Sequence, residues 1–453
     1  MKKLLVANRG EIACRVIRSA RALGIATVAV HSEADAASLH VKHADEAHEI
    51  GPAKAAESYL KVERILDAAR ASGAEAIHPG YGFLAENAEF AAAVTDNGLI
   101  WIGPEPAQIT AMGDKERARS IAERAGVPVL KGSPRFSIGN NEGLHAAAAQ
   151  VGYPLLVKAS AGGGGIGMKL VENGDALEKT VESTQSMAER SFGDGAVFLE
   201  RYIPKARHIE IQVFGFGDGR AVHFYERECS IQRRFQKVVE EAPASDLPAS
   251  VRDAMAQAAV SLAEAQSYRG AGTAEFIVDA ATKEFFFLEM NTRIQVEHPV
   301  TEMTTDSDLV GLQIRLARGD DLSALTQESI RQSGHAIECR LYAENPDKMF
   351  LPSPGQLNTL ILPQATDNVR IDTGVAEGDV ITPYYDPMIA KLICSGESRD
   401  AALDAMGAAL GQTSIEGIAN NVGFLRRVVA HPKFVAGDVF TGFIDAYKND
   451  LIG

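Results

Sequence analysis

Apolar positions in the first hundred residues alternate between short continuous runs and a helical spacing. Residues 4–8 form an apolar run that is typical of a strand, and the next segment repeats apolar side chains at helical intervals through Ile12, Val16 and Leu23. A second apolar run begins after Gly24. Strand, helix and strand in this order predict a parallel sheet with a crossover helix. We therefore expect an open α/β domain that extends to about residue 106.

A second, smaller α/β unit is predicted between residues 128 and 203. Its central segment, YPLLVKASAGGGGIGMKLV, reads as a strand, four consecutive glycines and another strand. Glycines at this density let backbone N–H groups approach a polyanion closely. Lys158 lies in the apolar strand just before them, where an unpaired ammonium is costly. A flexible linker is the alternative, but the flanking apolar strands favour a phosphate-covering loop; the Walker pattern G-x-x-x-x-G-K-[ST] is absent.

Residues 268–300 contain the densest cluster of candidate site residues in the chain. Two strands are predicted, 273–278 and 284–290, and alternation would bring Glu275 beside Glu289 and Asn291. Carboxylate and amide oxygens are the ligands that hard divalent cations prefer. A single acidic residue near a strand end is usually just solvated. The density of polar groups after the apolar run of residues 285–288 favours a metal-phosphate site instead.

Polar side chains continue on both sides of this stretch. Arg293, Gln295 and Glu297 keep the two-residue spacing and offer a cation, an amide and a base. The charged run 227–241 is ordinarily a solvated face, yet its position between the glycine loop and the metal stretch favours the wall of one cleft. In the later apolar segment GHAIECRLYAENP, Arg340 presents planar donors that fit a developing oxyanion.

Two further patterns concern helices. Residues 110–125 have the spacing of one helix, which contains Lys115, and residues 308–318 have the spacing of another.

Composition and charge restrict the function classes. The chain has 453 residues, 46% of them hydrophobic and 23% charged, and a net charge of −15. Two or three domains are expected at this length, and an acidic surface argues against nucleic-acid binding. The four cysteines are widely spaced, so reduced thiols and a cytoplasmic location are expected. Neither a signal peptide nor a segment of membrane-spanning length is recognised, so no membrane partner is expected.

A family resemblance rests on motifs spread over nearly the whole length. They are VANRGEIACRVIR, AIHPGYGFLAENAEFA, MGDKERAR, LVKASAGGGG, ARHIEIQVFG, ERECSIQRR, QKVVEEAPA, FLEMNTRIQVEHPVTEM, GHAIECRLYAENP and PYYDPMIAKLI. With them the chain resembles biotin carboxylase, the ATP-grasp component of biotin-dependent carboxylases. The resemblance implies an α/β protein, α+β in its C-terminal part. It would comprise a Rossmann-like pre-ATP-grasp domain (1–113), an ATP-grasp domain (114–330) with a mobile lid at about 130–203, and a biotin carboxylase C-terminal domain (331–447).

The same resemblance implies a ligase reaction and a set of site residues. ATP would phosphorylate bicarbonate to carboxyphosphate, which would carboxylate N1′ of biotin on a carrier protein. The residues implied for ATP are Lys115, Lys158, Gly163, Gly164, Glu200, Ile203, His208 and Gln232. Those implied for Mg²⁺ or Mn²⁺ are Glu275, Glu289 and Asn291. Those implied for bicarbonate and biotin are Lys237, Arg293, Gln295, Val296, Arg340 and Tyr81. Glu297 would be the general base, Arg340 would stabilise the biotin enolate, and Lys237 and Arg293 would complete the catalytic group.

Two positions depart from the family pattern. Ile166 follows the glycines where many relatives carry Arg or Lys, a feature that resembles urea carboxylases. Phe235 stands where His or Asn is usual, and its ring cannot donate a hydrogen bond to nucleotide. A nucleotide-binding ATP-grasp protein with lapsed catalysis is therefore kept as an alternative. Another ATP-grasp ligase, which makes an acyl phosphate for an amine, is a separate alternative that the substrate would distinguish.

Partners follow from the family. The chain has no Ala-Met-Lys-Met biotin-attachment sequence, so the carrier protein and the carboxyltransferase are expected on separate chains, unless the sequence is part of a longer protein. A homodimer is the family expectation. The acceptor is expected to be an acyl-CoA, with urea or a related small molecule as the runner-up.

Overall fold

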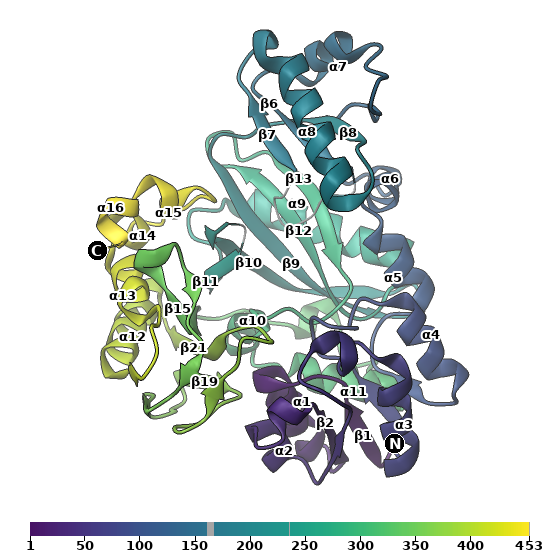
Figure 1. The fold of residues 1–453 in the computed structure, drawn as a ribbon, viewed down its shortest axis with the longest axis vertical. Coiled ribbons are helices and arrows are strands. Elements are labelled where there is room, and N and C mark those ends of the chain that lie inside the picture. The colour runs from purple at the N-terminus through teal and green to yellow at the C-terminus, as the bar shows by residue number, and fades with distance from the viewer. Residues whose placement is uncertain (161–166, 235, 453) are drawn as a thin grey trace.

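The computed structural model describes residues 1–160, 167–234 and 236–452 (Figure 1). The N-terminal region forms the predicted open α/β domain, built around a parallel sheet of order β3-β2-β1-β4-β5. This is the order of the first five strands of a Rossmann sheet. Its elements are β1 (Lys3–Val6), α1 (Gly10–Ala22), β2 (Ala26–His31), α2 (Leu39–His43), β3 (Glu46–Glu49), α3 (Val62–Ser72), β4 (Ala76–His78), α4 (Ala88–Asp96) and β5 (Ile100–Trp101).

Both faces of this sheet are buried, which explains why its strands read as continuous apolar runs. Leu4 and Val6 point into a core shared with α1 and α11 (Leu309–Arg318). Leu5 and Ala7 point the other way, into a core shared with α3 and α4.

The helix predicted over residues 110–125 is two helices, so that prediction was wrong. α5 (Pro106–Gly113) ends before Asp114, and α6 (Lys115–Arg124) begins after it. Asp114 has an extended backbone and its side chain accepts a hydrogen bond from the Arg117 N–H. Aspartate is a preferred helix N-cap because its carboxylate satisfies an amide that the first turn leaves free. No apolar side chain lies between Met112 and Ala118, and Gly113 followed by Asp114 within this gap was the signal of the break.

The predicted smaller unit is a separate three-stranded sheet at the top of Figure 1. Its elements are α7 (Leu144–Val151), β6 (Leu155–Ala159), β7 (Met168–Val171), α8 (Leu177–Phe192) and β8 (Val197–Arg201), with β6 between β7 and β8. The strands are antiparallel, and the unit has its own apolar core between sheet and helices. The glycine loop joins β6 to β7, and its residues 161–166 lie outside the described part of the chain.

An eight-stranded sheet forms the centre of the molecule, with the order β13-β12-β9-β10-β11-β14-β21-β19. Its strands are β9 (Ala206–Phe216), β10 (Ala221–Arg233), β11 (Gln236–Ala242), β12 (Arg269–Asp279), β13 (Phe285–Asn291), β14 (His335–Tyr342), β19 (Val369–Thr373) and β21 (Met388–Gly396). Neighbouring strands are antiparallel throughout. Helix α9 (Ala249–Ala265) packs on β9 and β10, while α10 (His298–Thr305) follows β13.

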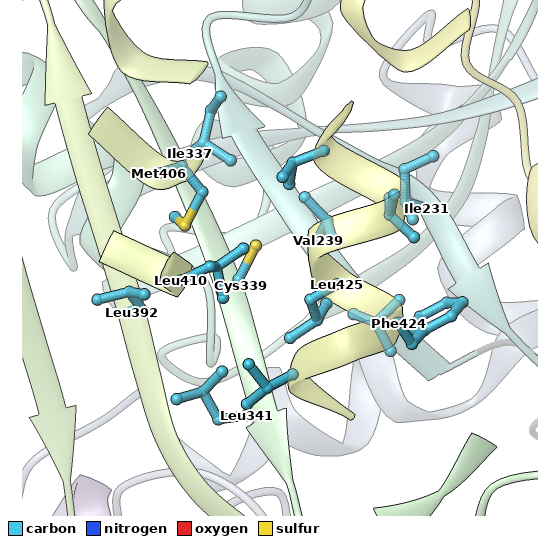
Figure 2. Packing of buried hydrophobic residues seen from close by; sticks show 14 of the residues in the cluster. Ile231, Val239, Ile337, Cys339, Leu341, Leu392, Met406, Leu410, Phe424 and Leu425 are labelled. Carbon is cyan, nitrogen blue, oxygen red and sulfur yellow. The ribbon is translucent and has the colours of Figure 1, made fainter. Parts of the chain in front are cut away.

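The C-terminal region adds short strands and a helical layer to this sheet. They are β15 (Glu344–Asn345), β16 (Leu351–Pro352), β17 (Gly355–Gln356), β18 (Thr359–Ile361), β20 (Val380–Ile381), α12 (Arg399–Gln412), β22 (Ser414–Glu416), α13 (Val422–Ala430), α14 (Pro432–Val435), α15 (Phe443–Ala446) and α16 (Lys448–Leu451). Figure 2 shows Met406 and Leu410 of α12 beside Ile337 and Cys339 of β14. Leu425 and Phe424 of α13 lie on the side of Val239 and Ile231, and all of these residues belong to one apolar core. The α/β class and the α+β character of the C-terminal part are confirmed.

Within the residues that the structure describes, no helix combines the length and apolarity needed to cross a membrane.

Candidate active site

A cavity of about 920 Å³ lies between the N-terminal domain and the central sheet. Its walls include the loops after β1 and β4, residues of β9, β11, β12 and β13, the end of β14, the start of β21 and the segment 374–386. Of the residues predicted from the sequence, this cavity is lined by Tyr81, His208, Lys237, Glu275, Glu289, Asn291, Arg293, Gln295, Val296 and Arg340.

The predicted metal residues meet through strand register. Glu275 on β12 is paired directly with Glu289 on β13, and Asn291 is paired with Thr273. On its other side Glu275 is paired with Glu210 of β9. The two predicted strands are thus confirmed, although the first is longer than expected.

The charge of Glu275 is stabilised by two cations. Its Oε1 accepts from Lys237 Nζ at 2.9 Å, and its Oε2 lies 3.1 Å from His208 Nε2. Burial alone would raise the pKa of Glu275, but Lys237 and His208 outweigh it and hold the pKa below its usual range. Asn291 Nδ2 is buried without a hydrogen-bond partner among the described residues. The carboxylate oxygens of Glu275 and Glu289 and the amide oxygen of Asn291 are the kind of ligands that fit a hard divalent cation.

Lys237 is surrounded by three carboxylates. Its Nζ donates to Glu210 at 2.6 Å, to Glu275 at 2.9 Å and to Glu297 at 2.6 Å. Burial would lower the pKa of this ammonium, but the three carboxylates raise it well above its usual value. Lys237 therefore carries a permanent positive charge at the cavity wall.

Glu297 lies directly behind the cavity wall, with a side chain that is 0% exposed. It is the N-cap residue of α10. Its Oε1 accepts from Lys237 and its Oε2 accepts from Arg340 Nη2 at 2.9 Å. Burial would raise the pKa of Glu297, but Lys237, Arg340 and Arg227 hold it well below the usual value. The side chain is therefore a carboxylate at neutral pH, able to accept a proton.

Arg340 contacts a second buried carboxylate that the sequence did not single out as a site residue. Glu240 Oε1 lies 2.6 Å from Arg340 Nη2, without the geometry of a hydrogen bond. Glu240 faces Glu338 directly across β11 and β14, and both side chains are buried. Burial raises the pKa of Glu240 to about 7 in spite of Arg340. It also raises the pKa of Glu338 well above the usual value.

Arg293 is held at the cavity by the N-terminal domain. Its Nε donates to Glu86 Oε2 at 2.8 Å, and its Nη1 donates to Gln295 Oε1 at 2.9 Å. Its Nη2 donates to Asn291 Oδ1 at 3.3 Å. The predicted bicarbonate residues Arg293 and Gln295 are thus neighbours of the predicted metal residue Asn291.

The predicted ATP residues are only partly assembled. Lys158 Nζ donates to Glu200 Oε2 at 2.5 Å in the small three-stranded sheet, and Gln232 Nε2 lies 2.9 Å from His208 Nδ1 in the central sheet. Ile203 is buried in a small apolar cluster between the two sheets. Apart from His208, these residues do not line the cavity. The side chain of Lys115 and residues Gly163, Gly164, Ile166 and Phe235 lie outside the described part of the structure.

Tyr81 lines the cavity, and its hydroxyl is bound to a second buried pair of charged residues, Glu11 and Lys391. Its hydroxyl donates to Glu11 at the start of α1. Glu11 Oε1 lies 3.1 Å from Lys391 Nζ of β21, and Lys391 also donates to the Val296 carbonyl at 2.8 Å.

Sequence reasoning missed Glu210, Glu86, Glu11 and Lys391 as site residues. Each lies inside a motif quoted for the resemblance, but its importance depends on which strands become neighbours. Glu210 alternates with apolar residues in HIEIQVFGF, and a charged residue on the buried face of a strand is the signal that could have identified it.

Comparisons with known proteins agree with this geometry. The biotin carboxylase N-terminal domain model matches residues 1–109, the carbamoyl-phosphate synthase L chain ATP-binding domain model matches 114–325, and the biotin carboxylase C-terminal domain model matches 338–446.

Among full sequences, a biotin carboxylase of Halalkalibacterium halodurans is 50% identical over 98% of this chain and 97% of its own length. The mitochondrial methylcrotonoyl-CoA carboxylase subunit alpha of Dictyostelium discoideum is 50% identical over 99% of this chain, which spans only 64% of that relative. Among solved structures, the biotin carboxylase domain dimer of Hydrogenobacter thermophilus 2-oxoglutarate carboxylase, in complex with MgADP, ADP and bicarbonate, superposes with a TM-score of 0.92. It is 44% identical, and the match covers 99% of this chain and 98% of that one.

An ATP-grasp ligase is the class of protein that this fold and site define. Within that class, the chain belongs to the biotin carboxylase family.

Proposed function

We propose that this chain catalyses the carboxylation of N1′ of biotin on a carrier protein, with ATP and bicarbonate as the other substrates and carboxyphosphate as the intermediate. The observation that carries the proposal is the contact of Glu297 with both Lys237 and Arg340 at one cavity wall. The predicted metal ligands Glu275 and Glu289 lie on the same wall. Two anion-binding cations and a metal-ligand set at one cavity, with a base directly behind its wall, suit the activation of bicarbonate by a phosphoryl donor.

Glu275, Glu289 and Asn291 would hold Mg²⁺ or Mn²⁺. When bound, the metal would neutralise charge on the phosphates of ATP. Lys158 and Glu200 in the small sheet, with Ile203, His208 and Gln232, are the described residues that we assign to ATP. The assignment also includes Lys115, Gly163 and Gly164. The unit that carries Lys158 is the proposed lid, and closure of this unit would bring the ammonium towards the phosphates.

Bicarbonate would bind among Lys237, Arg293, Gln295 and Val296. A bicarbonate anion there would compete with Glu297 for the same cations, so the hydrogen bond and ion pair between Lys237 and the Glu297 carboxylate would weaken. The affinity of Glu297 for a proton then rises. In this way a carboxylate with a very low pKa in the free protein becomes a competent base when its substrate is present. Removal of the bicarbonate proton makes its oxygen a better nucleophile for phosphorus.

Arg340 would stabilise the enolate of the biotin ureido ring, and Tyr81 would lie near that ring. Arg340 suits this role because its guanidinium has planar donors and a fixed charge. Its Nε is buried without a hydrogen-bond partner among the described residues, so one donor is available.

We further propose that the final acceptor is an acyl-CoA, as the name of the methylcrotonoyl-CoA carboxylase relative suggests for that protein. The biotin carrier and the carboxyltransferase would be the partners, and a homodimer would be the assembly. Transfer of labelled carboxylate from the carrier to 3-methylcrotonoyl-CoA in the complete carboxylase would support this acceptor, and transfer to urea instead would refute it.

The main test is ADP release by the purified protein with Mg·ATP and free biotin, with and without bicarbonate. We expect release to depend on both bicarbonate and biotin. The variant Glu297→Gln should lose about 100-fold or more of this turnover while ATP still binds, because it removes the base with little change in volume. The matched control is Glu264→Gln, which changes an exposed carboxylate of α9.

The alternatives predict different results. Turnover that needs an amine acceptor instead of biotin indicates another ATP-grasp ligase. ATP binding without bicarbonate-dependent turnover, even with a biotinylated carrier, indicates a protein with lapsed catalysis.

A further inference from the structure

Lys391 is a fully buried lysine that the proposed reaction does not use. It lies on β21, directly opposite Arg340 of β14 and Asp372 of β19, and its side chain is 0% exposed. Burial of an ammonium is costly unless carboxylates or other acceptors satisfy it. The residues that contact the Lys391 ammonium therefore indicate the role of its charge.

The ammonium is directed at the loop that carries the base. Its shortest contact is the hydrogen bond of 2.8 Å to the Val296 carbonyl, and its next is the ion pair of 3.1 Å with Glu11. Asp372 lies farther away, at 3.9 Å, and is already bound by Arg370 and Arg18. A simple ion pair with Asp372 would not account for this arrangement.

Each of the two closer contacts leads to a residue of the proposed site. The Val296 carbonyl belongs to the peptide unit whose nitrogen is that of Glu297, so a hydrogen bond there restricts the backbone that carries the base. Glu11 accepts a hydrogen bond from the Tyr81 hydroxyl. One ammonium thus joins three segments: the base loop of the central region, α1 of the N-terminal domain and β21 of the C-terminal region.

Backbone packing supports a close junction at the same place. Gly374, which follows β19, lies against the first residues of α1, and a Cβ atom there would be 2.4 Å from the Glu11 nitrogen. No side chain fits at that distance without movement of the backbone. The two regions therefore meet tightly where Lys391 and Glu11 form their ion pair.

We propose that Lys391 is a positioning residue, which sets Glu297 through the Val296 carbonyl and Tyr81 through Glu11. The inference rests on the proposed biotin carboxylation. Loss of the ammonium frees the base loop, and a small displacement of a base from its substrate lowers turnover strongly. The nucleotide residues Lys158 and Glu200 have no contact with Lys391, so ATP binding should be unaffected.

The test compares Lys391→Met, Glu11→Gln and the double variant in the full-length protein. Turnover is measured as bicarbonate-dependent ADP release, together with KM for bicarbonate, KM for ATP and the thermal midpoint. We expect Lys391→Met to lower turnover about tenfold or more and to raise KM for bicarbonate, with KM for ATP changed by less than about twofold. It should also lower the thermal midpoint, because Glu11 is left buried without its cation.

The double variant separates positioning from stability. It removes both charges, so the thermal midpoint should recover, whereas turnover should stay below that of Glu11→Gln alone. Arg252→Met is the matched control, because it also leaves a buried carboxylate, Glu226, without a cation that lies 2.6 Å away. This control should lose stability and keep the ratio of the two KM values.

Three outcomes would overturn the inference. They are wild-type turnover in Lys391→Met, recovery of turnover in parallel with the midpoint in the double variant, and an equal rise in both KM values. Absence of bicarbonate-dependent turnover in the unaltered chain would instead refute the proposed function, and this inference with it.

Discussion

The Glu240–Glu338 pair behind Arg340 predicts a specific dependence of stability on pH. Burial raises the pKa of Glu240 to about 7 from its ordinary value of 4.5. The folded protein therefore holds a proton that the unfolded chain has lost between these two pH values. The free energy of unfolding must then fall as the pH rises through this window, because ionised Glu240 is buried at a cost.

The magnitude follows from the difference in pKa. At about 1.4 kcal/mol for each pKa unit, the full penalty is about 3–4 kcal/mol, of which about 2–3 kcal/mol falls between pH 5 and pH 8. Glu240→Gln cannot ionise at this position. The free energy of unfolding of this variant, relative to that of the wild type, should therefore rise by about that amount between pH 5 and pH 8. Titrating groups distant from Glu240 are common to the two proteins and cancel in the comparison. Glu338 does not cancel, because Glu240 helps to raise its pKa, so the difference reports the titration of the Glu240–Glu338 pair.

Urea unfolding followed by circular dichroism at pH 5, 6, 7 and 8 measures the difference. Glu264→Gln, an exposed carboxylate of α9, should follow the wild-type pH profile. Infrared difference spectra between wild type and Glu240→Gln add a direct readout, since a protonated carboxyl absorbs apart from a carboxylate. Equal pH slopes for wild type and Glu240→Gln, with no protonated carboxyl at pH 6, would refute the reasoning.

Three further predictions concern the cavity and its surroundings. Glu86→Gln should raise KM for bicarbonate about two- to fivefold, because the partly exposed contact with Arg293 at 2.8 Å is worth no more than that; no change in a bicarbonate titration would place bicarbonate elsewhere. Lys158→Met should raise KM for ATP about tenfold, because a charge-assisted hydrogen bond to phosphate is lost; an ATP titration with unchanged KM would remove Lys158 from the ATP site. Gly374→Ala should cost about 1–3 kcal/mol of unfolding free energy, because the added Cβ would meet the backbone of α1 at 2.4 Å; an unchanged thermal midpoint would contradict this tight packing.

The local pattern of apolar and polar residues was sufficient to predict most helices and strands and the candidate metal ligands in residues 273–291. Strand alternation placed Glu275, Glu289 and Asn291 together because β12 and β13 are consecutive and pair with each other. A hairpin of this kind needs no knowledge of distant chain segments. The motifs of the family resemblance supplied the remaining candidates, and most of those with described side chains lie at one cavity.

The missed residues share one physical cause. Glu210 meets Glu275 only because β9 inserts beside β12, and Lys391 meets Val296 only because β21 pairs with β14. Such neighbours are far apart in the sequence, and their pairing is decided by burial of whole sheet faces and not by local spacing. The helix break at Asp114 was missed for a different reason, since the stop and start signals of Gly113 and Asp114 were read as part of one helix.

The continuous central sheet has a consequence for dividing the chain into fragments. Strand β11 pairs with β14, and the core of Figure 2 contains Ile231 and Val239 beside side chains of α12 and α13. A cut near residue 330 would leave β11 with unpaired backbone groups and an uncovered apolar face. Exposed strand edges of this kind recruit other chains and promote aggregation. The border between the ATP-binding domain model and the C-terminal domain model is therefore a poor place to truncate this protein. We expect either half to stay in solution only when it is expressed together with the other.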